Sequence, residues 1–187
     1  PLTHATANTE DDAVITVTFD ATDKDGDVKS GSFTVTVDDD APVISGTTSV
    51  SVDEEGLGGN AGDSYTSGDL TGAAVTATGT LGVSFGADGA ATTGAGFTLA
   101  AAGATWDAAT RTLTGADSAW TVVVQTNGSY TFTLLKPLTH ATANTEDDAV
   151  ITVTFDATDK DGDVKSGSLD RKSTPSELQS RGLISYA

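Results

Sequence analysis

The sequence predicts an all-β fold, in which antiparallel strands form a β-sandwich that is repeated along the chain. Thr and Val are frequent and Gly accounts for 21 of the 187 residues, a composition that favours strands joined by tight turns. Apolar and polar residues alternate in several runs, and no run of about ten residues carries a helical period with caps. A long internal repeat indicates that the sandwich is one unit of a tandem array.

The expected strands follow from alternation and from turn signals. The clearest hairpin joins residues 119–124 to 129–135, because Asn127-Gly128 between them is a strong turn signal. A long strand is expected over 149–157, and its earlier copy turns at 23–27 and returns over 28–37. Shorter strands are expected at 49–52, 74–85, 97–99 and 110–114.

The repeat sets the domain boundaries. Residues 1–32 recur without change at 137–168, so that Asp23 corresponds to Asp159. The Asp-rich linker that ends at Pro42 is stiff, because Pro restricts itself and the residue before it. We therefore expect 1–42 to be the C-terminal part of one repeat, and 43–168 to be the next repeat, lacking its last strand.

The end of the chain departs from the repeat. Residues 169–187 match nothing earlier, show no strand alternation and contain Arg171, Lys172 and Arg181, three of the 9 basic residues. We expect a vector-derived tail; a genuine, divergent repeat end is the alternative. Because the sequence contains no Met, the chain is expected to be a piece of a longer protein.

Charge excludes several classes of partner. The formal net charge of −18 repels phosphate backbones and anionic membrane surfaces, so no nucleic-acid partner is expected. No segment approaches the roughly 20 apolar residues of a membrane span, so no membrane insertion by this chain is expected. Cys is absent, which excludes disulfides and thiolate metal sites. A surface this acidic instead attracts cations.

A repeated aspartate motif carries the strongest chemical signal. The first copy contains Asp23, Asp25 and Asp27, and the second contains Asp159, Asp161 and Asp163. Three carboxylates at alternate positions around a Gly turn can converge on one Ca²⁺, which accepts six to eight oxygen ligands in flexible geometry. The alternative is an acidic β-turn without an ion, since Asp and Gly are common turn residues.

Topology links this motif to other acidic runs. If the chain enters a sandwich at one end and leaves at the other, the turn before the last strand lies at the entry end. Asp159, Asp161 and Asp163 should then lie beside the linker residues Asp38, Asp39 and Asp40, forming a Ca²⁺ site between repeats. Asp53 and Glu55, which are also expected to bind Ca²⁺, should lie at the exit end, near 146–148. Taken alone, the linker run, the Asp53–Glu55 run and 146–148 each also fit a solvated acidic surface.

Catalysis is not expected. The two His residues, His4 and His140, occupy the same repeat position, which is more typical of a turn or surface residue than of a base. No Gly-x-Ser-x-Gly nucleophile motif and no Cys occur. Acidic loops without an aromatic-rich cleft also argue against glycoside hydrolysis.

The string GSYTFTLLKPLTH at 128–140, the DKDGD motif at 159–163 and the linker DDDAP at 38–42 resemble the long tandem repeats of giant RTX-type adhesins, which Gram-negative bacteria export by type I secretion. The resemblance covers about 1–168. It implies an Ig-like, cadherin-like sandwich, Ca²⁺ at the linkers and a location on the extracellular bacterial surface. It also implies an extender role between neighbouring repeats that supports adhesion or biofilm formation. The chain has no C-terminal glycine-rich nonapeptides, so secretion and anchoring cannot be assigned to it.

Two further possibilities remain open. Trp106 and Trp120 could stack on sugars, which would make the chain a ligand-binding adhesin module; a core Trp in each sandwich is the alternative. An open sheet edge in 43–168 could also accept the strand 33–37 from another copy, so strand exchange is expected as a second partnership.

Overall fold

The computed structural model describes residues 12–57, 74–139 and 149–170. Within these ranges all regular structure is β-strand, apart from three short 3-10 turns, η1 (Glu54–Leu57), η2 (Thr93–Gly96) and η3 (Ala116–Ser118). The all-β prediction is confirmed. Among the described residues, no helix is long and apolar enough to cross a membrane.

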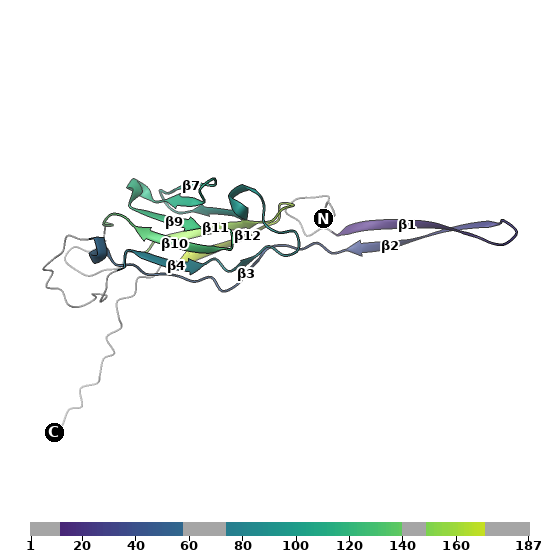
Figure 1. Ribbon diagram of the computed structural model, residues 1–187, viewed down its shortest axis with the longest axis horizontal. Helices are drawn as coiled ribbons and strands as arrows, with labels where there is room; N and C mark the ends of the chain where they lie inside the picture. Colours follow the sequence, from purple (N-terminus) through teal and green to yellow (C-terminus); the bar gives the residue numbers. More distant parts are fainter. Residues whose placement is uncertain (1–11, 58–73, 140–148, 171–187) are drawn as a thin grey trace, which may run out of the picture.

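The body of the molecule contains two main antiparallel sheets, an arrangement consistent with a β-sandwich (Figure 1). One sheet has the order β4 (Thr76–Thr80), β10 (Ser129–Leu134), β9 (Trp120–Val124), β8 (Thr112–Thr114) and β7 (Thr105–Asp107). The other has the order β12 (Val164–Asp170), β11 (Thr152–Thr158) and β6 (Phe97–Ala100). A short pair, β3 (Val43–Ile44) and β5 (Val83–Ser84), lies at the start of the body.

Both sheets contribute to one hydrophobic core. Buried and less buried positions alternate along β9, β10 and β11, as the period of two in a strand requires. Trp120 of the larger sheet stacks on Phe132 with ring centroids 5.8 Å apart. Phe155 of the smaller sheet is 1% exposed and joins the same core. The hairpin predicted over 119–124 and 129–135 is thus β9–β10, and this prediction is confirmed.

A second part, the β1–β2 hairpin, extends away from the body (Figure 1). Strands β1 (Ala13–Thr22) and β2 (Val28–Val37) pair along all ten residues. The linker 38–42 joins this hairpin to β3, and Pro42 in the linker is buried. The hairpin has the same sequence as β11–β12 up to Ser32, yet it leaves its apolar side chains exposed to solvent.

The last strand of the second repeat differs from the prediction. Strand β12 forms and pairs with β11, so the expectation that 43–168 lacks this strand is wrong. The strand covers Val164–Asp170, and Asp170 is the last residue that the structure describes. It continues past the repeat because Leu169, where the first copy has Phe33, keeps the apolar alternation and is 5% exposed. Residues 171–187 lie outside the described part of the chain.

The structure also differs from the prediction for two other strands. Residues 49–52 are not part of a described strand, although the N–H of Thr48 donates to the carbonyl of Thr80 and the N–H of Asp53 donates to the carbonyl of Ala74. The expected strand 74–85 is interrupted at Gly82, whose φ of 63° breaks the extended backbone between β4 and β5.

Candidate metal centre

The turn between β11 and β12 brings three carboxylates together. Asp159 accepts hydrogen bonds at Oδ1 from the N–H groups of Gly162 (3.0 Å) and Asp163 (2.7 Å). Its own N–H donates to the carbonyl of Asp163 at 3.1 Å, and Gly162 supplies the positive φ of 113° that the turn needs. As a result, Asp159, Asp161 and Asp163 each offer an oxygen within 4.8 Å of the others.

This turn is covered by the segment that precedes β6. Ala90 forms a β-bridge with Asp159, and the N–H of Ala91 donates to the carbonyl of Thr158 at 3.0 Å. Asp159 is therefore only 1% exposed and Asp163 only 4%. The burial removes water from side chains that would otherwise be hydrated.

Buried carboxylate oxygens in the turn lack a hydrogen-bond partner among the described residues. Oδ2 of Asp159 and Oδ1 of Asp161 are the clear cases. A buried charged oxygen without a partner is strongly unfavourable. A hard cation would supply the missing contact, and carboxylate oxygens are the donors that Ca²⁺ prefers. The residues present therefore fit the ion that the sequence predicts.

The electrostatics of the turn agree with this fit. Burial, and next the neighbouring Asp161 carboxyl, raise the pKa of Asp159 to about 6. The N–H groups of Asp163 and Gly162 oppose the rise only in part. Near neutral pH the turn therefore holds a crowded, poorly hydrated negative charge.

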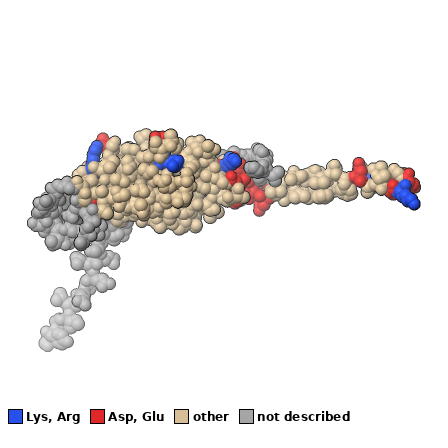
Figure 2. All heavy atoms as spheres, in the orientation of Figure 1, with Lys and Arg blue, Asp and Glu red and all other residues tan. Residues whose placement is uncertain are grey.

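The linker brings a further carboxylate to the same place. Asp39 lies with Asp88 and Asp161, each offering an oxygen within 4.8 Å of the other two. All three are partly buried, and they come from the linker, the turn after β5 and the β11–β12 turn. Asp161 belongs to both groups of aspartates. Figure 2 shows acidic atoms gathered where the hairpin joins the body.

The other two linker aspartates have different places. Asp40 accepts a hydrogen bond at Oδ2 from the N–H of Ala87 (2.7 Å), which fastens the linker to the loop that carries Asp88. Only Gly fits at position 86, because a Cβ there would lie 1.9 Å from Oδ2 of Asp40. Asp38 is exposed and joins neither group of the described residues.

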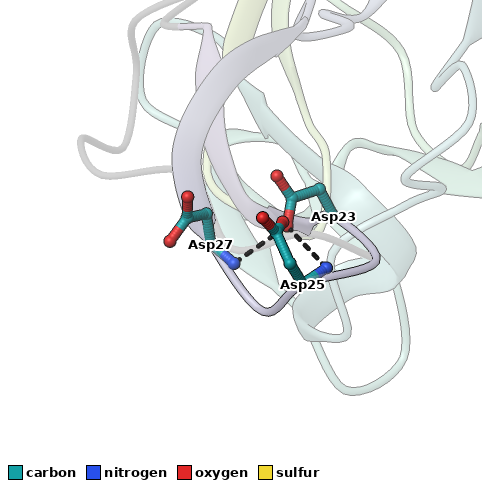
Figure 3. A group of neighbouring side chains, drawn as sticks. All are labelled: Asp23, Asp25 and Asp27. Atoms are coloured by element: carbon teal, nitrogen blue, oxygen red, sulfur yellow. Dashed lines mark hydrogen bonds between the residues drawn. The ribbon is translucent and has the colours of Figure 1, made fainter.

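The first copy of the motif, in the turn between β1 and β2, has the same local geometry, but its aspartates are exposed instead of buried. Asp23 accepts hydrogen bonds at Oδ1 from the N–H groups of Asp25 (3.2 Å), Gly26 (3.1 Å) and Asp27 (2.9 Å). Figure 3 shows the bonds from Asp25 and Asp27. All three aspartates are exposed at the hairpin tip. A side-chain contact with Asp25 and the N–H of Asp27 lower the pKa of Asp23.

The remaining predicted ligands lie elsewhere. Asp53 precedes η1, at the end of the body opposite the hairpin (Figure 1), and joins no acidic group of the described residues. The Glu55 side chain, residues 146–148 and both His residues lie outside the described part. Asp88 was missed by the sequence analysis, although the turn residues Gly86 and Gly89 on either side of it were a usable signal.

The two Trp residues differ in burial. Trp120 is 5% exposed and lies in the core, while Trp106 is partly buried on the edge strand β7. Neither forms an exposed aromatic platform, so the geometry of the described residues offers no particular support for sugar binding.

Comparison with known proteins adds no relative: no family model, no curated protein and no solved structure matches the chain.

Proposed function

We propose that the chain is a structural spacer of a large bacterial surface adhesin, in which Ca²⁺ stiffens the joint between successive repeats. The observation that carries this proposal is the placement of Asp39, a linker residue, within 4.8 Å of Asp88 and Asp161 of the repeat that follows. Three negative side chains from separate segments repel one another unless a cation lies between them.

The shared residue Asp161 couples the joint to the fold. It belongs to the buried group with Asp159 and Asp163, and also to the linker group with Asp39 and Asp88. A divalent ion supplies positive charge and oxygen coordination to such groups. Residues that hold the turn in shape therefore also hold the direction in which the linker leaves the body, as a rigid spacer requires.

The finer assignment rests on the resemblance to RTX-type adhesin repeats. It comprises an Ig-like sandwich, export to the extracellular bacterial surface and support of adhesion or biofilm formation. An ion that binds only the folded state stabilises it by mass action, by about 2.7 kcal/mol when the free ion is 100-fold above its dissociation constant. Outside the cell, where Ca²⁺ is abundant, folding would be favoured.

The proposal is tested by thermal melting and calorimetric Ca²⁺ titration of Asp161→Asn. This change removes a ligand common to both groups, so we expect Ca²⁺ affinity to fall at least tenfold and the gain in melting temperature to shrink. The matched control is Asp25→Asn, the same residue of the exposed copy. In a chain dilute enough to stay monomeric, it should retain the Ca²⁺-dependent gain in melting temperature.

Three results would contradict the proposal. One is a melting temperature of the unaltered chain that Ca²⁺ and chelator leave unchanged. Another is equal loss of affinity in Asp161→Asn and Asp25→Asn. The third is a response to Mg²⁺ as large as that to Ca²⁺, because Mg²⁺ prefers a small octahedral site with several waters.

A further inference from the structure

We propose that the β1–β2 hairpin of one chain replaces β11–β12 in the body of a second copy, joining chains head to tail. The inference is argued from packing and not from the ion proposed above, although exchange would bring the turn of Asp23, Asp25 and Asp27 to the place of the Asp159–Asp163 turn. It concerns the exposed apolar face of the hairpin and identifies a second copy of this chain as its occupant.

The hairpin exposes side chains whose counterparts are buried. Phe19 is 52% exposed, while Phe155, the same residue of the repeat, is 1% exposed. Val17 is 37% exposed, while its counterpart Val153 is 3% exposed. The difference is one of surroundings, since the two strands share one sequence. An apolar face of this kind is a docking surface.

The structure itself contains the site that this hairpin fits. Strand β11 pairs with β6, with Phe155 opposite Leu99 and Thr154 opposite Ala100. Because β1 has the same residues in the same order, it can make the same pairs with β6 of another chain. The hairpins share their internal register as well: Phe19 lies opposite Gly31, as Phe155 lies opposite Gly167.

The incoming hairpin carries more apolar residues than the hairpin that it displaces. Phe33 would take the place of Leu169. The first copy then carries Val35 and Val37 where the second copy carries the polar residues Arg171 and Ser173. Exchange therefore exposes the apolar face of β11–β12 to solvent but buries the more apolar face of β1–β2. Because more apolar surface is buried than exposed, the free energy favours exchange.

The hairpin cannot fill this site in its own body. Its tip would have to take the place of the Asp159–Asp163 turn, at the end of the body where the linker enters. Val37 would then lie about ten strand residues away, or about 33 Å. The six residue steps from Val37 to Val43 span at most about 21 Å. Only a second chain can accept the hairpin.

Exchange would reproduce the order of a covalent tandem array. The linker of the incoming chain leaves the acceptor at its far end and leads into the body of the incoming chain. That body can accept a third hairpin in turn. Such a contact is heterologous and can continue without closing.

A crossed pair of variants tests the exchange, with mass measured by light scattering after chromatography over a range of concentrations. Phe19→Ser weakens only the donated hairpin, so oligomers should become at least tenfold weaker while the melting temperature of the monomer is unchanged. Phe155→Ser, the matched variant, weakens the resident hairpin, so the oligomer fraction should rise. Oligomers that Phe155→Ser leaves unchanged or diminishes would overturn the proposal, as would a chain that is monomeric at every concentration.

A disulfide test reports the register, and the absence of native Cys makes it specific. One chain carries Thr18→Cys and another Ala100→Cys, the counterparts of the pair Thr154 and Ala100. The two chains are unfolded together, refolded and oxidised. A covalent dimer is expected, and it should be absent when Thr126→Cys, in the exposed β9–β10 turn, replaces Ala100→Cys. Oligomers without this dimer, or equal cross-linking in the control, would overturn the exchange.

Discussion

The first aspartate of the repeated motif is present in two copies, Asp23 and Asp159, whose pKa values are shifted in opposite directions. Asp23 and Asp159 accept the same kind of N–H bonds within the same turn sequence. Those bonds and the Asp25 side chain lower the pKa of Asp23 at the exposed tip, while burial raises the pKa of Asp159 to about 6. The chemistry of the motif is therefore decided by what covers the turn.

The raised pKa predicts how stability depends on pH without Ca²⁺. In the unfolded chain Asp159 titrates near its ordinary value of 3.8, and in the folded chain near 6. Its contribution is fully present below the unfolded pKa and is lost as pH rises through the folded pKa. Urea unfolding in chelator, between pH 3.5 and 7, should show this loss. With Ca²⁺, which requires ionised carboxylates, the trend should reverse.

The control for this prediction is Asp159→Asn, which does not titrate. The loss is measured as the difference in unfolding free energy between the unaltered chain and this variant. That difference removes the contribution of other carboxylates, such as Asp107, whose pKa is lowered by Thr110. Parallel pH curves for the two proteins would contradict the assignment.

At this scale the sequence predicted the meeting of linker and turn only in part. Entry and exit topology placed the Asp159 motif beside the linker, and Asp39 does meet Asp161 there. It could not distinguish Asp39 from Asp38 and Asp40, because one residue step along an extended linker turns a side chain to another side. Asp88 contributes through a loop whose path depends on tertiary packing.

At the scale of elements, a Phe ring over a Gly links the two strands of both repeat hairpins. A Cβ on Gly167 would lie 2.5 Å from Cζ of Phe155 and 3.1 Å from Cδ1 of Ile44. A Cβ on Gly31 would lie 2.6 Å from Cζ of Phe19. The difference is that Phe155 is enclosed by the core, while Phe19 can rotate into solvent.

This difference predicts that Gly167→Ala destabilises the body by about 1–3 kcal/mol, the usual effect of overpacking a core. Gly31→Ala should change the unfolding free energy of the body by less than about 0.5 kcal/mol, as surface substitutions do. Chemical denaturation followed by Trp fluorescence measures both, since Trp120 lies in the core. Equal effects would show that β11–β12 does not pack as described.

The long strands could be predicted because alternation persists over many residues, as in β1, β9, β10 and β11. The short strands β3 and β7 could not be predicted, because two or three residues show no period, and β5 was predicted only as part of the longer run 74–85. Strand β12 shows the opposite case. Its repeat sequence stops at Ser168, but any apolar residue at the next inward position, here Leu169, is enough to continue the pairing.

At the scale of the whole molecule, the two acidic groups have separable roles. The group of Asp159, Asp161 and Asp163 lies within the fold of the body, and the group of Asp39, Asp88 and Asp161 lies where the linker meets the body. The first should control stability and the second the orientation of the hairpin. Because only Asp39 belongs to the linker, changing it should separate the two effects.

We therefore predict that Asp39→Asn retains most of the Ca²⁺-dependent gain in melting temperature but loses the stiffness of the joint. Spin labels attached through Lys24→Cys at the hairpin tip and Ala109→Cys in the β7–β8 turn would report the distance between hairpin and body, in a chain diluted to remain monomeric. With Ca²⁺ the distance distribution of the parent should narrow, and that of Asp39→Asn should stay as broad as in chelator. Asp38→Asn, in which an exposed carboxylate is lost, should behave like the parent. A narrow distribution in Asp39→Asn would contradict the joint, because the hairpin would then be held by contacts that need no linker carboxylate.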